Sequence, residues 1–219
     1  MRKILISAMV IGLVCALIGA GVYAVFSDTE TSTGNTFTAG TLNLVPSTSG
    51  TGPGGKYTVT EGSDGVNGKV VFEKLAPGDS GTITWSLTNT GSVDGLLTLT
   101  SAMTFTGESI NEPECIDEGG SWDGSCSVSD PSGDLGAEMK VWLSVVDPDN
   151  PSGRDVYGSS GSYAALSGLK TAIDGETSLD MDSGEEYVYK LSWKIPTTVD
   201  NIIQSDKAAL DITFALTQS

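Results

Sequence analysis

The stretch Thr82-Ile83-Thr84-Trp85-Ser86-Leu87-Thr88-Asn89 decides the fold class, because apolar and polar side chains alternate along it at every step. Successive side chains of a strand point to opposite faces, so Ile83, Trp85 and Leu87 share one face and the hydroxyl residues share the other. This period of two is typical of a strand in an antiparallel sheet that buries one face and exposes the other to water. The stretch therefore predicts an all-β protein.

Two later segments alternate in the same way, from Tyr187 to Ile195 and from Leu210 to Leu216. Weaker strand patterns lie at 57–60, 69–75, 95–105 and 138–147. Several short strands separated by turn residues predict an antiparallel β-sandwich, jelly-roll-like or immunoglobulin-like in its connections. Trp85 and Trp193 lie on the apolar faces of their strands, so we expect both side chains in the core.

The connections between the predicted strands comprise tight turns and three longer segments. Ala76-Pro77-Gly78-Asp79 places Pro77 at the first corner and Gly78 at the second, which is typical of a type II turn that ends at Asp79. The Ser-, Thr-, Gly- and Pro-rich residues 46–56 predict a flexible linker, followed by the sandwich domain over residues 57–219. We expect two long acidic loop insertions, at 106–136 and at 147–184, and a short helix within 162–173 of the second.

The charge of the chain excludes several classes of function. Its 219 residues include 28 acidic and 11 basic side chains and no histidine, which gives a net charge of −17. Such a surface repels phosphate, so nucleic acid is not an expected partner. The absence of histidine removes the commonest metal ligand and general base. The residues therefore predict no catalytic site, no metal site and no cofactor, and we do not expect an enzyme.

The N-terminus has the features of an export signal. Arg2 and Lys3 precede an uncharged run from Ile4 to Phe26, with small residues before a cleavage point between Ala24 and Val25. Residues 1–24 are therefore predicted to be a signal removed by signal peptidase, which places the protein outside the cell or at its surface. The same run is long enough to span a bilayer, so an uncleaved anchor is the alternative and is the one expected contact with a membrane.

Only two cysteines follow the signal, Cys115 and Cys126, and they flank a Gly-rich acidic segment. A lone pair at this spacing in an exported chain predicts a disulfide, and a metal site without histidine is the weaker alternative. Trp122 lies inside this loop and is the tryptophan that we expect to be exposed. The segment 147–155 resembles a calcium loop superficially, but Pro151 occupies a ligand position, so a solvated acidic turn is expected.

Several motifs in succession resemble the TasA/camelysin family of exported proteins, which includes biofilm-matrix fibre subunits and archaeal bundling-pilus subunits. The motifs are Tyr23-Ala24-Val25-Phe26-Ser27-Asp28, Asn35-Thr36-Phe37-Thr38-Ala39-Gly40-Thr41-Leu42-Asn43-Leu44, Leu75-Ala76-Pro77-Gly78-Asp79, Thr84-Trp85-Ser86-Leu87-Thr88-Asn89-Thr90-Gly91-Ser92, and the closing residues Asn201, Gln204, Asp206, Phe214 and Gln218. The resemblance implies a jelly-roll subunit that polymerises by lending its N-terminal segment to the next molecule. Camelysin-like members are described as metallopeptidases, but this sequence has no His-Glu-x-x-His motif.

Residues 25–45 are the expected donor strand of such a homopolymer. A sandwich that lacks a strand exposes an edge and an apolar groove, and a strand from another copy satisfies both. Head-to-tail donation does not close on itself, so it generates a filament. The alternative is a monomeric secreted or anchored binding module in which Thr36 to Val45 forms the first strand of its own domain. The residues expected to carry donation are Val25, Phe26, Phe37, Ala39, Leu42, Leu44 and Val45, with Gly40 at a change of face.

Removal of the signal also removes two basic residues, which leaves 11 − 2 = 9 against 28 acidic ones and a net charge of −19. Copies of such a chain repel one another unless salt or divalent cations screen the charge. We therefore expect bundles of filaments to weaken at low ionic strength or with chelator.

Overall fold

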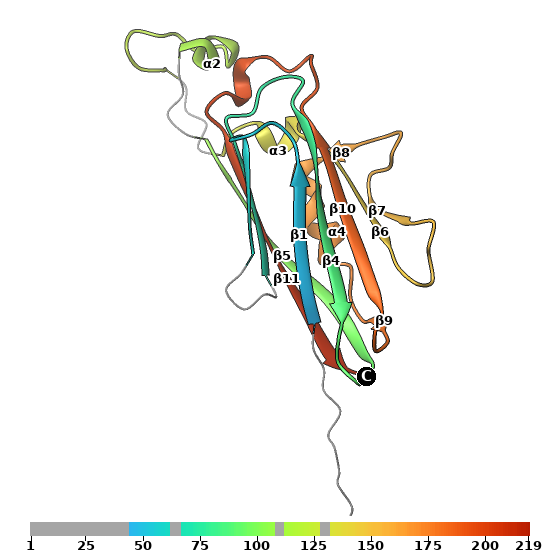
Figure 1. Cartoon of the computed structure of the whole chain (residues 1–219). Helices are drawn as coiled ribbons and strands as arrows, with labels where there is room; N and C mark the ends of the chain where they lie inside the picture. Colours follow the sequence, from blue (N-terminus) through green and yellow to red (C-terminus); the bar gives the residue numbers. More distant parts are fainter. Residues whose placement is uncertain (1–43, 62–66, 108–111, 128–131) are drawn as a thin grey trace, which may run out of the picture. The chain divides into compact units, whose positions relative to one another are not determined.

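The computed structural model describes residues 44–61, 67–107, 112–127 and 132–219, and residues 44–219 contain a two-layer antiparallel β-sandwich (Figure 1). The six-stranded sheet has the order β1-β4-β10-β6-β7, with β8 also paired to β6, and the five-stranded sheet has the order β2-β3-β11-β5-β9. The predicted all-β sandwich is confirmed, whereas its jelly-roll connectivity stays a prediction. The strands of the larger sheet are β1 (Leu44–Thr51), β4 (Ser80–Asn89), β6 (Lys140–Val146), β7 (Arg154–Tyr157), β8 (Ala164–Ala165) and β10 (Glu186–Lys194). Those of the smaller sheet are β2 (Tyr57–Glu61), β3 (Asn67–Glu73), β5 (Gly95–Thr106), β9 (Leu179–Met181) and β11 (Lys207–Gln218).

Every strand that the alternation predicted is present. In β4 the predicted apolar face of Ile83, Trp85 and Leu87 is buried, while the hydroxyl residues between them stay partly exposed. Trp85 and Trp193 are each 1% exposed and lie in the core, as expected. Their indole N–H groups are buried and have no acceptor among the described residues, which is a local cost that the surrounding apolar contacts offset.

The flexible linker predicted over residues 46–56 is wrong for its first part, because Pro46 to Thr51 belong to β1. This strand pairs along its whole length with β4, with Leu44 opposite Asn89 and Thr51 opposite Thr82. Its ladder depends on backbone groups, so a Ser-, Thr- and Gly-rich segment forms it without an apolar pattern. Only residues 52–56 connect β1 to β2.

The two expected insertions contain more regular structure than the sequence suggested. The first contains α2 (Glu112–Asp117) and α3 (Leu135–Glu138), and the second contributes β7, β8 and β9. The short helix expected within 162–173 is found as η1 (Leu166–Gly168) and α4 (Leu169–Ile173). A further turn, η2 (Asn201–Ile203), follows β10. Among the described residues, no helix is long and apolar enough to span a bilayer.

The strand registers define two ends of the sandwich. At the Asn89 end, β1 begins beside Asn89, and the pairing of β10 with β4 begins at Glu186. At the Lys194 end, β10 pairs with the start of β4 and the start of β6. The segment that precedes Leu44 therefore joins the sandwich at the Asn89 end.

Candidate functional site

On one lateral side of the sandwich, two strand edges have no partner strand within the part of the chain that the structure describes. The edge strand β1 of the larger sheet and the edge strand β2 of the smaller sheet are joined by residues 52–56 and flank this side (Figure 1). Between them runs a groove of about 700 Å³, lined by residues from β1, from the connection and from β2. Among the described residues no further strand pairs with either edge. This side is therefore where another strand can be added.

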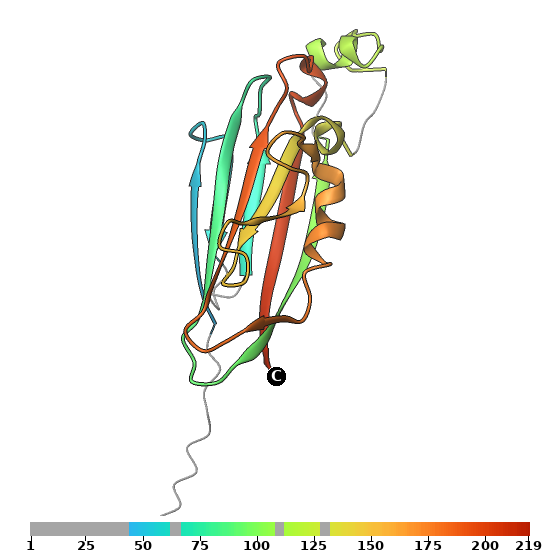
Figure 2. The same cartoon turned by 90° about the vertical axis from the view of Figure 1, so that its right-hand side faces the viewer.

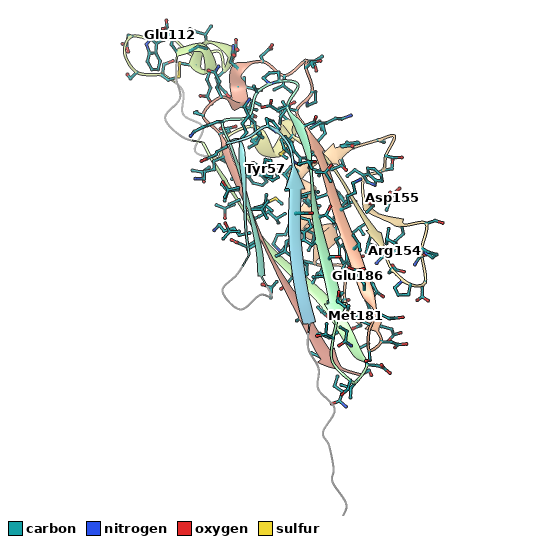
Figure 3. All side chains as sticks on the ribbon, viewed as in Figure 1. Tyr57, Glu112, Arg154, Asp155, Met181 and Glu186 are labelled. Atoms are coloured by element: carbon teal, nitrogen blue, oxygen red, sulfur yellow. A yellow bond between two sulfur atoms is a disulfide. The ribbon has the colours of Figure 1, made fainter. Side chains whose placement is uncertain are left out.

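Glycines and aromatic rings shape the groove. Tyr57, which is labelled in Figure 3, is half-buried and packs edge-on against Trp193 with ring centroids 6.0 Å apart. A Cβ atom at Gly50 would lie 3.0 Å from the Tyr57 ring, and one at Gly52 would lie 3.1 Å from the Trp193 ring. Larger side chains at these two positions would displace the rings, which is the local reason for glycine near the end of β1 and at the start of the connection to β2.

The free edge of β2 offers a complete set of backbone groups. The N–H of Glu73 donates to the carbonyl of Lys56 at 3.0 Å, and hydrogen-bonded pairs alternate along an antiparallel ladder. Thr58 and Thr60 therefore bond to β3, whereas the N–H and C=O groups of Tyr57, Val59 and Glu61 point away from the sheet. Because the side chain of Val59 packs against the core, its backbone is held in place for a partner strand.

The edge of β1 is incomplete by comparison. The N–H of Asn89 donates to Glu185 across the other side of β4, so the even-numbered residues of β4 bond to β1 and the even-numbered residues of β1 face outward. Pro46 is one of these outward positions, and proline has no N–H to offer. An added strand therefore finds more backbone partners on β2 than on β1.

The opposite side of the sandwich is closed. Figure 2 shows α4 lying along it, and the buried side chains of Leu166, Leu169 and Ile173 join the core there. An ion-pair network fixes this closure: Arg154 of β7 donates to both carboxylate oxygens of Glu176, at 2.9 and 2.5 Å, and the Tyr189 hydroxyl donates to the same carboxylate at 3.0 Å.

The network shifts the pKa values of its members. Burial raises the pKa of the Tyr189 hydroxyl well above its usual value, and the nearby Glu176 carboxylate raises it further. The hydrogen bond to Glu176 raises the pKa of Arg154. Burial also raises the pKa of the neighbouring Tyr187 to about 12. All three groups stay in one protonation state at neutral pH, so the network is a structural clamp and not an acid–base pair.

The cysteine loop forms a separate projection at the Lys194 end. We call residues 112–127 the knob; they contain α2 and the disulfide between Cys115 and Cys126, whose Cα atoms are 5.6 Å apart. The Asp117 carboxylate accepts hydrogen bonds from the backbone and side chain of Asn201, both at 3.0 Å. Trp122 is half-buried and not fully exposed as expected, and its backbone forms an isolated bridge with that of Cys126.

The acidic segment 147–155 is a turn closed by its own side chains. The Asp147 carboxylate accepts hydrogen bonds from the backbone and the side chain of Asn150, at 2.8 and 2.9 Å, and from Arg154 at 3.4 Å. Both carboxylate oxygens therefore have partners within the turn. Across the described residues, no group of three or more Cys, Asp or Glu side chains is arranged to hold a metal ion.

The Pro77-Gly78-Asp79 turn helps to position the groove. The N–H of Asp79 donates to the carbonyl of Ala76 at 3.0 Å, and Gly78 has a φ of +91°, as the second corner of a type II turn requires. The Asp79 carboxylate accepts a hydrogen bond from Lys56 at 2.7 Å. This ion pair ties the turn before β4 to the residue that directly precedes β2.

Most of the predicted donor strand, including Val25, Phe26, Phe37, Ala39, Gly40 and Leu42, lies outside the described residues, as do the predicted signal and its predicted cleavage point at Ala24. The two described members contradict their assignment: Leu44 and Val45 pair with Asn89 and Thr88 of their own sheet. Without this pairing the edge of β4 would be open. The end of the segment therefore forms the first strand of its own domain, as the alternative interpretation predicted. The donor segment is thereby shortened to residues 25–43.

The residues that line the groove were not singled out from the sequence. Tyr57 and Val59 were recognised only as part of a weak strand, and the glycines at 50, 52 and 54 only as part of a linker. A signal was present nevertheless: the glycines at 50 and 52, close in sequence to Tyr57, indicate a backbone that another group approaches closely, here the Tyr57 and Trp193 rings.

The described residues form an antiparallel β-sandwich with α4 along one side and a groove between β1 and β2 on the other. The family model described as camelysin metallo-endopeptidase matches residues 1–50, a stretch that ends within β1. This match confirms the resemblance of the N-terminal region to the TasA/camelysin family. No curated protein matches the sequence.

Proposed function

We propose that this protein is the structural subunit of an extracellular filament, in which residues 25–43 of one copy form a strand on the β2 edge of the next copy. The open groove beside a complete backbone edge is the observation that carries the proposal. The N-terminal match to the camelysin family supports it, because the matched stretch contains both the export signal and the donor segment.

The direction of β2 favours donation between copies. Tyr57 begins β2 near the Lys194 end, and the chain runs from there toward the Asn89 end. A donor antiparallel to β2 therefore leaves the groove at the Lys194 end. The chain's own segment precedes β1 at the Asn89 end, so it would run parallel to β2 if it turned back directly beside β1. Antiparallel pairing is slightly more stable per residue, and it places the Asn89 end of one copy toward the Lys194 end of the next.

The segment has the length and the apolar side chains that donation requires. Residues 25–43 span up to roughly 60 Å when extended, whereas the five residues of β2 span about 17 Å. The remainder suffices to connect two domains. Val25, Phe26, Phe37 and Leu42 supply about 6–12 kcal/mol of gross burial energy, at roughly 1.5–3 kcal/mol for each large side chain, before the cost of ordering.

Cleavage after Ala24 makes the segment available in this account. While residues 1–24 are attached, the donor is held at the membrane; once they are removed, its end is free to enter a neighbour. The disulfide of the knob forms after export in the same scheme. N-terminal sequencing of the mature protein tests the first step, and Val25 is the residue expected at position one.

Deletion of residues 25–35 tests the proposal. The truncated mature chain should fold with the same melting temperature and form no filaments in negative-stain images, since the described sandwich lies outside the deletion. Filaments of unchanged length and stability would contradict donation. A protein that stays monomeric and binds one ligand at the cell surface would instead favour the binding-module alternative.

The description of the matching family suggests a second candidate function, that of a metallo-endopeptidase. The chain contains no histidine, and its described carboxylates form no cluster suited to a metal. These features support a structural role over hydrolysis. Chelator-sensitive hydrolysis of casein by the purified chain would favour the peptidase.

A further inference from the structure

The outer face of the larger sheet is positively charged, although the chain as a whole is acidic. Arg154 and the lysines at 56, 69, 170 and 207 each form an ion pair with a carboxylate. Lys140, Lys190 and Lys194 form none with any described carboxylate, and all three occupy outward positions of β6 and β10. Lys140 lies directly opposite Lys194 in the ladder, an arrangement in which like charges destabilise a sheet.

Apolar side chains accompany these lysines. The Trp142 ring packs edge-on against Tyr163 at a centroid distance of 6.2 Å, and the Lys194 ammonium lies 4.3 Å from the centre of the Tyr163 ring. Val146 is 43% exposed and lies opposite Val188 on the same face. We call this surface the lysine face; its members are Lys140, Trp142, Val146, Val188, Lys190 and Lys194.

The rest of this face does not neutralise the lysines. The outward positions of β4 carry only serine and threonine. Glu186 is the one carboxylate among the outward positions of β4, β6 and β10, and it accepts a hydrogen bond from Ser86. Asp155 of β7 accepts a hydrogen bond from the indole N–H of Trp142 at 2.6 Å. Lys140 donates a hydrogen bond to the carbonyl of Ala137. A surface that combines cations outside any ion pair, aromatic rings and exposed valine has the composition of an interface for an anionic partner with an apolar tip.

The knob of the same protein has that complementary composition. It carries the exposed carboxylates of Glu112 and Asp123, and its Ile116 side chain is 54% exposed. Among the described residues, Ile116 and Val146 are the exposed large apolar side chains, one on each of the two surfaces. The knob projects away from the two sheets, where Glu112 is labelled (Figure 3), and its disulfide closes the loop between Cys115 and Cys126.

We propose that the knob of one copy docks on the lysine face of another copy, with Ile116 against the apolar residues and the knob carboxylates against the three lysines. The two surfaces differ, so the contact is heterologous and extends from copy to copy without closing. It uses neither residues 25–43 nor the groove, so it adds a second type of contact to a filament, one that joins neighbouring filaments laterally.

The charges give this contact a distinctive dependence on salt. At about 0.01 M salt the Debye length is near 30 Å, and the net negative charges of two copies repel each other. Near 0.15 M it is about 8 Å, so this repulsion is screened while ion pairs at contact distance persist. At about 1 M the ion pairs are screened as well. Lateral association should therefore be strongest at intermediate ionic strength.

A charge swap tests the proposal. Variant one carries Lys190→Glu and Lys194→Glu, and variant two carries Glu112→Lys and Asp123→Lys; all four positions are exposed. Each variant alone should associate about tenfold or more weakly than the parent, and an equimolar mixture should recover association, because each altered surface then meets its complement. The control, Lys74→Glu, makes the same kind of charge change at an exposed lysine away from the face that also forms no ion pair with a described carboxylate, and it should behave like the parent.

Two readouts separate this contact from strand donation. Filament length in negative-stain images reports donation and should not change in any charge variant, whereas filament pairing reports the lateral contact. Sedimentation of the full mature chain carrying Val59→Pro, in which donation is blocked, measures the lateral contact alone. Unchanged association in variant one, or no recovery in the mixture, would overturn the proposal. So would a parent chain that fails to self-associate but binds polygalacturonate through the same lysines.

Discussion

Replacement of Val59 by proline should abolish polymerisation while leaving the subunit folded. The N–H of Val59 faces away from β3, so its loss removes no hydrogen bond of the sandwich, and proline is tolerated at such edge positions. The side chain is half-buried against the core, and exchange of its methyl groups for the ring should cost about 1 kcal/mol of folding stability.

The effect on assembly should be much larger. The donor strand loses one hydrogen bond, worth about 1 kcal/mol net, and one of its carbonyl groups is buried without a partner, which costs about 1–3 kcal/mol. The sum of about 2–4 kcal/mol corresponds to a loss of roughly 30-fold to nearly 1000-fold in affinity between subunits.

Thr58→Pro is the matched control for this variant. The N–H of Thr58 faces β3, where it pairs with Val71, so this substitution damages the subunit and spares the outward edge. It should lower the melting temperature more than Val59→Pro and disturb polymerisation less at temperatures where it is folded. Sedimentation at increasing protein concentration gives the critical concentration, and circular dichroism gives the melting temperature. If Val59→Pro assembles at the parent's critical concentration, the β2 edge is not the acceptor.

Three further predictions concern the subunit itself. Glu176→Gln should lower the free energy of unfolding by about 2 kcal/mol, less than for a fully buried ion pair because the Arg154 side chain is 31% exposed; a denaturant midpoint equal to the parent's would contradict the clamp. The fold favours the neutral hydroxyls of Tyr187 and Tyr189, so their contribution to stability should be fully present below about pH 10, the tyrosine pKa in an unfolded chain. This contribution should be lost as the pH rises through about 12. Thermal melts at increasing pH should show a flatter decline for the double Phe variant than for the parent. Replacement of both knob cysteines by serine should lower stability by up to about 3 kcal/mol, and thiol labelling of the unreduced parent should find no free cysteine at either position.

The sequence predicted those parts of the fold that depend on periodicity. The strands around Trp85 and Trp193 follow from a period of two, because burial of one face forces that pattern whatever the partner strand is. The strand β1 could not be predicted in this way. Its small residues are needed because the rings of Tyr57 and Trp193 lie close to its end. Those contacts form only when the two sheets pack against each other.

The candidate site shows the same division. Residues 25–43 attract notice in the sequence because an apolar segment follows a cleavage signal. The acceptor edge depends on which N–H groups of β2 point outward, and this follows from the register of β2 on β3. The clamp of Arg154 and Glu176 also joins segments 22 residues apart, and no local pattern marks them as partners.

An electron cryo-microscopy map of the assembled filament tests the central claim most directly. The account predicts a strand formed by residues from 25–43 of one copy, antiparallel to β2 and bonded to the backbone of Val59 in the next copy, with the Asn89 end of the first toward the Lys194 end of the second. A map in which this segment pairs within its own subunit, or in which the β2 edge faces solvent along the filament, would contradict it.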